Sequence, residues 1–303
     1  MLEPEPKLKA DGHDSHPAEP ALAELVDFVS RHKSLAVLSG AGCSTGSGIP
    51  EYRDDAGNWK HRKPVQLAEF MSSAGTRRRY WAQSFAGWVR ISEAKPNAAH
   101  LALARLERVE RIGCVITQNV DNLHRRAGSR SVIDLHGVLH RVRCLRCGVT
   151  KPRGAFQQEL AERNPGWTVA VREFAPDGDA RLRALDFDSY VVPDCFACGG
   201  ILKPDVVFFG EAVPLRRVEQ ASEAVRRSEA LLVVGSSLMV FSGFRFARMA
   251  KTLGKPIAIV NRGTTRADHL AVHKVTDDCG TILSRLADCV IKEPDARGLD
   301  RRL

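Results

Sequence analysis

Two pairs of cysteines have the spacing of a metal site, Cys144-x-x-Cys147 and Cys195-x-x-Cys198. Two thiolates two residues apart can bind one ion, and four sulfurs at about 2.3 Å complete a tetrahedral zinc site with no position left for water or substrate. A glycine follows each pair, which lets the chain turn tightly. A redox Cys-x-x-Cys is the alternative, but two pairs in a polar segment favour metal. The sequence therefore predicts one structural zinc per chain.

Residues 35–53 read LAVLSGAGCSTGSGIPEYR, an apolar strand that runs into a glycine-rich loop. Such loops commonly bind phosphate through backbone N–H groups. In a dinucleotide-dependent dehydrogenase the pattern is G-x-G-x-x-G, with an acid about 20 residues further on. Gly40 and Gly42 fit it, but Thr45 stands at the third glycine, and no second strand ends in an acid at that distance. The loop indicates phosphate binding and argues against a dehydrogenase.

Polar side chains also follow the next two strands, where residues 117–124 read TQNVDNLH and residues 134–137 read DLHG. Ligands of α/β proteins bind at the carboxyl ends of parallel strands, so Gln118, Asn119 and Asp121 are placed for sugar hydroxyls or an amide. Helix capping by Asn119 or Asp121 is the alternative. His136 is a candidate general base because its pKa lies near working pH and the following glycine leaves room for substrate. A lone histidine is, however, more often structural.

Three later segments could also contact a ligand. Gly235-Ser236-Ser237 follows a strand and could hold phosphate, and Asn261 follows the next strand and could hold a ribose hydroxyl. Residues 205–211, DVVFFGE, are extended and apolar. They are either a core strand or an edge to which a substrate peptide adds as a strand.

These segments belong to a chain that alternates short apolar strands with helices, which predicts a doubly wound parallel, Rossmann-like α/β sheet. From about residue 141 to 202 the alternation stops and cysteine and glycine increase, which indicates an inserted small zinc-binding module. We therefore divide the chain into a disordered tail (1–20), a Rossmann-like domain (21–137 and 203–293, with a loop and helical insert at 45–96) and the module (138–202). The expected strands are 35–38, 113–117, 132–135, 230–235, 256–260 and a short last one at 289–291; the expected helices are 22–29, one from 97, 214–229, 243–253 and 280–287.

Composition sets bounds on partners and location. The 303-residue chain has a formal net charge of +9, but its basic residues are scattered, which favours a solvated surface over a specific nucleic-acid site. No apolar run approaches the roughly 18–20 residues of a membrane span. The first 20 residues have no apolar signal core, and the eight cysteines then favour a reducing compartment. We expect a cytoplasmic protein without a membrane or specific nucleic-acid partner.

Taken in order, several motifs resemble those of the sirtuins, NAD-dependent protein deacylases: GAGCSTGSGIPEYR, TQNVDNLH, DLHG, the two cysteine pairs, LKPDVVFFGE, GSSL and IVN. The resemblance covers about residues 20–290. APDGDA, the 47 residues between the cysteine pairs and RRRYWAQSFAGW are similar to the class II branch, to which the mitochondrial lipoamidase and ADP-ribosyltransferase sirtuin belongs. Because an import signal is missing, we expect a bacterial member. One departure is Cys43, where the family more often has isoleucine.

The resemblance implies a role for each matching position. His136 would be the general base, with Asn119 and Asp121 also catalytic. The acyl-lysine peptide would lie as a strand along Val207, Phe208, Phe209 and Gly210, and Cys144, Cys147, Cys195 and Cys198 would bind zinc. NAD would be bound by the glycine-rich loop, its mobile continuation and the polar strand ends: Gly40, Ala41, Gly42, Ser44, Ile49, Pro50, Tyr52, Arg53, Gln118, Asn119, Asp121, Gly235, Ser236, Ser237, Asn261 and Cys279.

The resemblance also implies a reaction. The acyl-lysine carbonyl oxygen would attack the ribose carbon that releases nicotinamide, and His136 would activate a ribose hydroxyl, giving free lysine and O-acyl-ADP-ribose. Protein ADP-ribosylation and a non-catalytic module that binds NAD or O-acyl-ADP-ribose are the alternatives. Succinyl-preferring sirtuins carry Tyr-x-x-Arg beside the acyl tunnel, whereas this chain has Tyr80-x-x-Gln83. That difference predicts a preference for neutral acyl groups longer than acetyl, or lipoyl-like ones.

Overall fold

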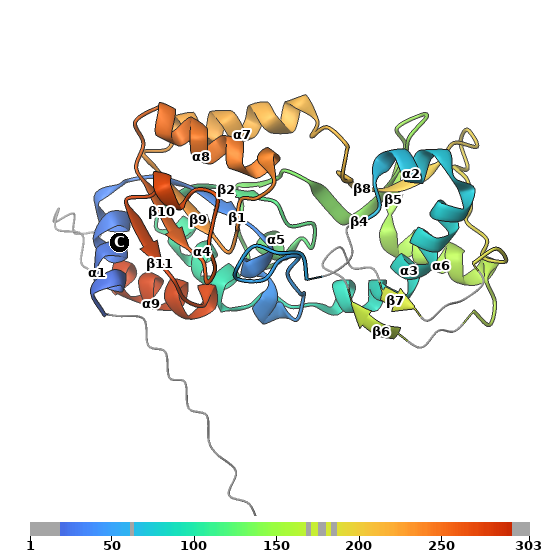
Figure 1. Ribbon diagram of the computed structural model, residues 1–303, viewed down its shortest axis with the longest axis horizontal. Helices are drawn as coiled ribbons and strands as arrows, with labels where there is room; N and C mark the ends of the chain where they lie inside the picture. The colour runs from blue at the N-terminus through green and yellow to red at the C-terminus, as the bar shows by residue number, and fades with distance from the viewer. Residues whose placement is uncertain (1–18, 61–63, 168–170, 175–179, 183–186, 293–303) are drawn as a thin grey trace, which may run out of the picture.

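The computed structural model describes residues 19–60, 64–167, 171–174, 180–182 and 187–292 (Figure 1). The predicted tail lies outside the described residues as far as position 18, and its last two residues begin the first helix, α1 (Glu19–Arg31). Residues 175–179, which form most of the APDGDA segment, also lie outside the described residues.

A six-stranded parallel sheet forms the larger part of the structure, as the alternation of strands and helices predicts. Its strand order is β11-β10-β9-β1-β2-β3. From β1 at the centre, β2 and β3 extend the sheet on one side, and β9, β10 and β11 extend it on the other. The strands are β1 (Leu35–Ser39), β2 (Ile112–Thr117), β3 (Val132–Asp134), β9 (Ala230–Val234), β10 (Ile257–Val260) and β11 (His273–Val275). The doubly wound fold class is therefore confirmed.

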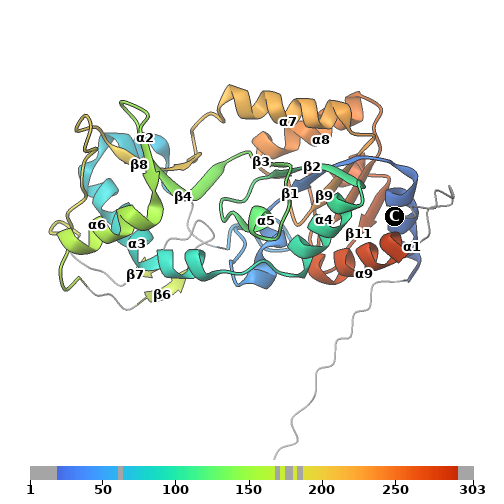
Figure 2. The same cartoon turned by 180° about the vertical axis from the view of Figure 1, so that it is seen from behind.

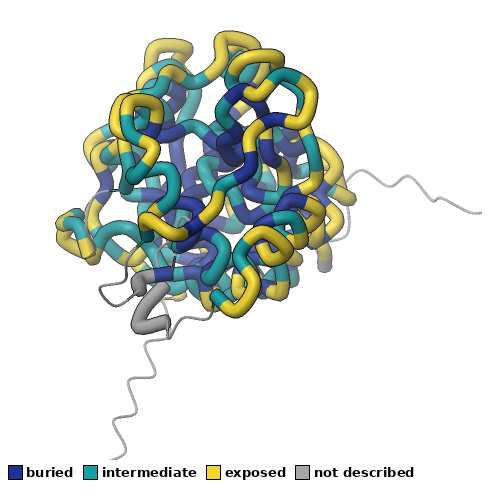
Figure 3. Tube along the Cα trace, turned by 90° about the vertical axis from the view of Figure 1, so that its right-hand side faces the viewer, coloured by how far each residue is buried: buried dark blue, intermediate teal, exposed yellow. Residues whose placement is uncertain are grey.

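Helices cover both faces of this sheet because its central strands β1, β9 and β10 are mostly apolar and are buried at every position. Along β1, Leu35 and Val37 face one core cluster, and Ala36 and Leu38 face another. The first cluster lies against α1, α4 (Ala98–Arg108) and α9 (Cys279–Lys292), and the second against α7 (Leu215–Arg227) and α8 (Phe241–Thr252), as Figure 1 shows. Figure 3 shows the buried interior enclosed by exposed turns.

The expected last strand at Cys289–Ile291 is wrong, because these residues continue α9 to Lys292. Ile282, Leu283, Leu286 and Val290 are buried at helical spacing, and Val290 belongs to that stripe. A short apolar run at the end of an amphipathic helix reads as a strand when it is taken without the turns before it.

The smaller part is built on an antiparallel sheet with the order β5-β4-β8. Its strands are β4 (Gly137–Cys144), β5 (Thr150–Pro152) and β8 (Leu202–Val206), and the pair β6 (Val171–Phe174) and β7 (Ala180–Leu182) lies apart. Helices α2 (Leu67–Ser72), α3 (Ala74–Glu93) and α6 (Arg153–Arg163) lie beside it in Figure 2. Their side chains share one apolar cluster that includes Phe70, Trp81 and Phe156.

Short elements complete the connections: η1 (Ala41–Cys43), η2 (Thr45–Ser47), α5 (Leu123–Arg126) and η3 (Asp268–Leu270). Among the described residues, no helix is long and apolar enough to cross a membrane. The segment DVVFFGE is a strand only as far as Val206. Beyond it, Val207 N–H donates to the His136 carbonyl and Phe209 forms an isolated bridge with Gln66.

Candidate active site and metal centre

One cavity of about 420 Å³ lies at the carboxyl ends of β1, β2, β9 and β10. We call it the cleft. All the catalytic, cofactor-binding and substrate-binding residues predicted from the sequence line it. They reach it from loops far apart in the chain, which the parallel sheet brings to one edge.

His136 is held in the cleft by two hydrogen bonds. Its Nδ1 lies 2.9 Å from the Gln118 carbonyl oxygen, and its Nε2 lies 2.8 Å from Ser242 Oγ. Because a carbonyl can only accept, Nδ1 carries the proton and Nε2 is left as the acceptor. Burial lowers the pKa of His136 to about 4, so the ring is neutral near pH 7. A neutral ring whose Nε2 carries no proton is the form that a general base requires.

Gly137 serves a different purpose from the one expected. Its φ is +86°, and a Cβ there would lie 2.0 Å from the Asp205 carbonyl oxygen. The glycine therefore lets β4 approach β8, where Gly137 pairs with Val206, rather than leaving space for a substrate.

Asn119, Ser44 and Asp121 form a hydrogen-bonded chain in the cleft. Asn119 Nδ2 donates to the Gly40 carbonyl oxygen at 2.9 Å and to Ser44 Oγ at 3.0 Å, and Ser44 Oγ donates to Asp121 Oδ2 at 2.7 Å. Asp121 Oδ1 accepts from the Leu123 N–H at 2.9 Å at the start of α5, but the N-cap of that helix is Asn122, so Asp121 is not its capping residue. Burial raises the pKa of Asp121, while the hydrogen bonds from Leu123 and Ser44 oppose the shift.

The loops after β1 and β9 touch through their backbones. Gly42 N–H donates to the Gly235 carbonyl oxygen at 2.8 Å. A Cβ on Gly235 would lie 2.2 Å from the Cys43 nitrogen, and one on Gly40 would lie 2.7 Å from Ser236 Cβ. Contacts this close require glycine, and they leave a cleft floor of bare backbone. This floor fits the diphosphate of a dinucleotide, which binds backbone N–H groups at such turns.

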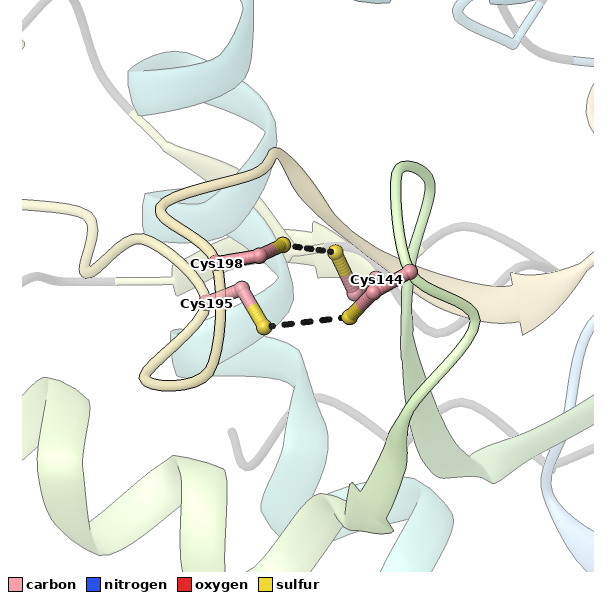
Figure 4. Close-up of side chains that lie close together, drawn as sticks. Cys144, Cys195 and Cys198 are labelled. Atoms are coloured by element: carbon pink, nitrogen blue, oxygen red, sulfur yellow. Dashed lines mark hydrogen bonds between the residues drawn. The ribbon is translucent and has the colours of Figure 1, made fainter.

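The four zinc-ligand candidates come together at the far end of β4. Their sulfurs all lie within 4.8 Å of one another, with 3.5 Å between Cys144 and Cys198 and 3.7 Å between Cys147 and Cys195. Figure 4 shows the two knuckles facing each other. The backbone N–H groups of Cys147 and Arg146 lower the pKa of Cys144, whereas burial raises the pKa of its neighbour Cys198. Four converging sulfurs near such donors fit a structural zinc, which binds thiolates.

Comparison with known proteins agrees with this geometry. The sequence model of the Sir2 family matches residues 40–242. The chain belongs to the Sir2 family. "NAD-dependent protein deacetylase 2" of Bradyrhizobium diazoefficiens is 56% identical over 262 residues, which cover 86% of this chain and 96% of the relative. "NAD-dependent protein deacylase Sirt4" of Drosophila melanogaster is 46% identical over 279 residues, 91% of this chain and 89% of the relative.

Solved Sir2 structures share the fold. One Sir2 enzyme matches with a TM-score of 0.71 and 30% identity over 90% of this chain and 99% of its own. A Sir2 bound to acetylated peptide matches with a TM-score of 0.71 and 29% identity over 88% and 97%. The resemblance to the sirtuins is thus confirmed, and the assignment to the class II branch stays a prediction.

In this Sir2-family chain, one end of the cleft has an apolar wall. Tyr80 lines it, together with Val65, Ile91, Leu139 and Phe208, whereas Gln83 does not. The three arginines before Tyr80 do not line it either. Arg77 donates to the Phe70 and Met71 carbonyls, and Arg78 donates to Asp188. Of the described residues, the arginines that line the cleft are Arg53 and Arg262.

Both of these arginines have partners. Arg53 donates to the Gly57 carbonyl oxygen and lies 4.2 Å from the centre of the Trp59 ring, and Arg262 pairs with Asp278 at 3.4 Å. Trp59 packs in turn on Tyr52 and Phe209. Sequence reasoning missed Trp59 and Ser242. The only signal for Ser242 is its position five residues after the Ser236–Ser237 turn.

Proposed function

We propose that this chain is an NAD-dependent protein lysine deacylase that releases nicotinamide and O-acyl-ADP-ribose. The observation that carries the proposal is the neutral His136, whose Nε2 faces the same cleft as the glycine floor. The names of the relatives from Bradyrhizobium and Drosophila support it. A protein that only bound NAD would have no use for a base at this position.

The residues of the cleft have separate roles in the proposed reaction. NAD, when bound, supplies a ribose carbon that loses nicotinamide and a neighbouring hydroxyl that must give up a proton. His136 Nε2 accepts that proton, while the Gln118 carbonyl keeps the opposite nitrogen protonated and the ring in place. Asn119 and Asp121, fixed through Ser44, orient the nicotinamide and ribose. The aromatic rings of Tyr52 and Trp59, which pack edge to face, line the same cleft.

We place the acyl-lysine peptide along residues 207–210. This segment follows β8 without continuing its ladder: Val207 N–H donates to the His136 carbonyl and Phe209 pairs with Gln66, so an added strand would use the remaining backbone groups of the segment. A solved structure described as Sir2 bound to acetylated peptide supports an acyl-lysine peptide as the substrate, without giving its position. The proposal includes a cytoplasmic location, supported by eight unpaired cysteines, and involves neither a membrane nor a specific nucleic acid.

Replacement of His136 by alanine tests the proposal. We expect deacylation of an acetyl-lysine peptide to fall by at least about a hundredfold, because a positioned base contributes on the order of 10²–10⁴. NAD affinity should change by less than about threefold, since the base acts after binding. His140→Gln, a histidine that does not line the cleft, is the matched control and should stay active.

Nicotinamide release distinguishes the alternatives. The proposed deacylase should release nicotinamide only when an acylated peptide is present, and the peptide should be deacylated at the same time. A protein ADP-ribosyltransferase would release nicotinamide with an unacylated acceptor protein and would attach ADP-ribose to it. If His136→Ala keeps most of its deacylation rate, His136 is not the base.

We further propose that neutral acyl groups longer than acetyl, or lipoyl-like ones, are preferred. The apolar wall gains roughly 0.8 kcal/mol for each CH₂ it buries. A succinyl carboxylate buried there without a cation costs on the order of a few kcal/mol, because Arg77 and Arg78 are directed elsewhere. We expect kcat/KM for butyryl- or lipoyl-lysine to exceed that for succinyl-lysine by at least about tenfold on one peptide sequence. A succinyl preference would contradict the proposal.

A further inference from the structure

Cys43, His100 and His124 form a second cluster of metal-binding side chains, and deacylation does not use it. The Cys43 sulfur and one ring nitrogen of each histidine all lie within 4.8 Å of one another. The three residues are only 1%, 0% and 2% exposed. They come from η1, α4 and α5, so three separate elements hold them together.

The cluster contains a buried polar atom without a partner. His124 Nε2 lies 2.8 Å from Ser39 Oγ, but among the described residues its Nδ1 has no hydrogen-bond partner. His100 Nδ1 lies 3.0 Å from Asn97 Oδ1 and 3.3 Å from the Asn97 backbone nitrogen, while its Nε2 has only a long contact of 3.5 Å with Ser44 Oγ. Buried polar atoms are almost always paired in folded proteins, so these nitrogens have capacity for a ligand.

The surroundings favour a cation over an anion. Burial, followed by Cys279, Asp121 and Asp278, raises the pKa of the Cys43 thiol well above its usual range. The carboxylates among these neighbours, Asp121 and Asp278, would stabilise a positive ion beside the sulfur. Burial also lowers the pKa of His100 to about 4 and that of His124 well below its usual value, so both rings are neutral. Neutral imidazole is the form that binds metal.

The donor set selects the kind of metal. One sulfur and two imidazoles suit zinc and other thiophilic ions, whereas magnesium and calcium require oxygen ligands. Because the three atoms are no more than 4.8 Å apart, a point exists within about 2.8 Å of all of them. Zinc bonds of about 2.0–2.3 Å would then need each ligand atom to move inward by at most roughly 0.5–0.8 Å.

We propose that Cys43, His100 and His124 bind a zinc ion behind the cleft, and that this ion inhibits the use of NAD. When sulfur binds the ion, the thiol proton is released to solvent. The inhibition rests on the proposed function and follows from Ser44, which lies 3.5 Å from His100 Nε2 and connects Asn119 to Asp121. An ion bound to His100 would replace its contact with Ser44 and would attract the Asp121 carboxylate. Ser44 would then no longer hold Asn119 in its position in the cleft.

Zinc content provides the first test and does not depend on activity. We would equilibrate the holoenzyme with zinc at buffered free concentrations and measure metal per chain. We expect two zinc ions in the wild type and one in Cys43→Ile, because that variant keeps the four-cysteine site. Cys289→Ser, which replaces an exposed cysteine on α9, is the matched control and should bind two. Cys43→Ser is a smaller change and should also bind one zinc ion. It keeps the test valid if the isoleucine variant does not fold.

The NAD dissociation constant at the same zinc concentrations provides the second test. We expect this dissociation constant to rise at least about tenfold in the wild type and in Cys289→Ser, and to stay constant in Cys43→Ile. By linkage, NAD should weaken the binding of the second zinc ion by the same factor. One zinc per chain in the wild type, or equal inhibition of Cys43→Ile, would overturn the proposal. A chain that binds the second zinc through Cys43 but deacylates no peptide would instead refute the proposed function and support the cation site.

Discussion

Ser242 controls the proton-accepting nitrogen of His136. Its hydroxyl lies 2.8 Å from Nε2, and since Nδ1 donates to the Gln118 carbonyl, the Ser242 hydroxyl must be the donor. This hydrogen bond stabilises the neutral ring. Gly243 lets the first turn of α8 come this close, because a Cβ there would lie 2.3 Å from Gln118 Oε1.

We predict that Ser242→Ala shifts the pH dependence of deacylation. Without the donated hydrogen bond the neutral ring is less stabilised, so the pKa of His136 rises above about 4, although burial, the main cause of its lowering, remains. The base is then protonated at a higher pH, and the acid limb of kcat/KM for NAD moves upward. Ser242→Thr keeps the hydroxyl and should keep the wild-type limb. If both variants follow the wild-type profile, Ser242 has only a packing role.

At the scale of elements, the cleft depends on two loops that meet backbone to backbone. Gly235 has a φ of +57°, and its missing Cβ leaves room for the Cys43 nitrogen at the start of the glycine-rich loop. The loops after β1 and β9 therefore form one surface, although nearly 200 residues separate them in the chain.

Gly235→Ala should separate these loops. We expect it to weaken NAD binding by at least about tenfold and to lower the free energy of unfolding by roughly 1–3 kcal/mol, through the clash and the positive φ. Gly254→Ala is the matched control, because Gly254 has a φ of +68° with no atom within 4 Å of the added Cβ. It should lose some stability but bind NAD normally, as calorimetry and thermal unfolding would show. Equal NAD binding by the two variants would contradict the role of the loop contact.

At the scale of the whole molecule, the zinc site and the cleft share one apolar cluster. Cys144 and Cys195 pack in the same cluster as Tyr80, Leu139 and Phe208, three residues that line the cleft. Loss of the metal should therefore disturb the apolar wall of the cleft, where we place the acyl chain.

We predict that Cys195→Ala loses both zinc and activity. Removing one of four thiolates weakens a site whose apparent binding free energy is on the order of ten kcal/mol, and that energy stabilises the surrounding fold. Zinc from the four-cysteine site and deacylation should be lost together, with a lower thermal midpoint. Cys289→Ser should match the wild type in all three measurements. An active Cys195→Ala protein without this zinc would show that the metal is dispensable.

The sequence alone determined the features that depend on local spacing. The cysteine pairs predicted the metal centre, the alternation of apolar strands and helices predicted the parallel sheet, and the polar strand ends predicted which residues line the cleft. These predictions succeed because the carboxyl ends of parallel strands must meet at one edge.

Only the tertiary structure decided what lies between distant segments. It assigned Gly137 to the contact with β8, placed Ser242 on His136 and gathered Cys43, His100 and His124 behind the cleft. It also joined residues 289–291 to α9, whose stripe packs on the sheet. Each outcome depends on distances between residues of different elements, which packing in three dimensions sets and periodicity along the chain does not.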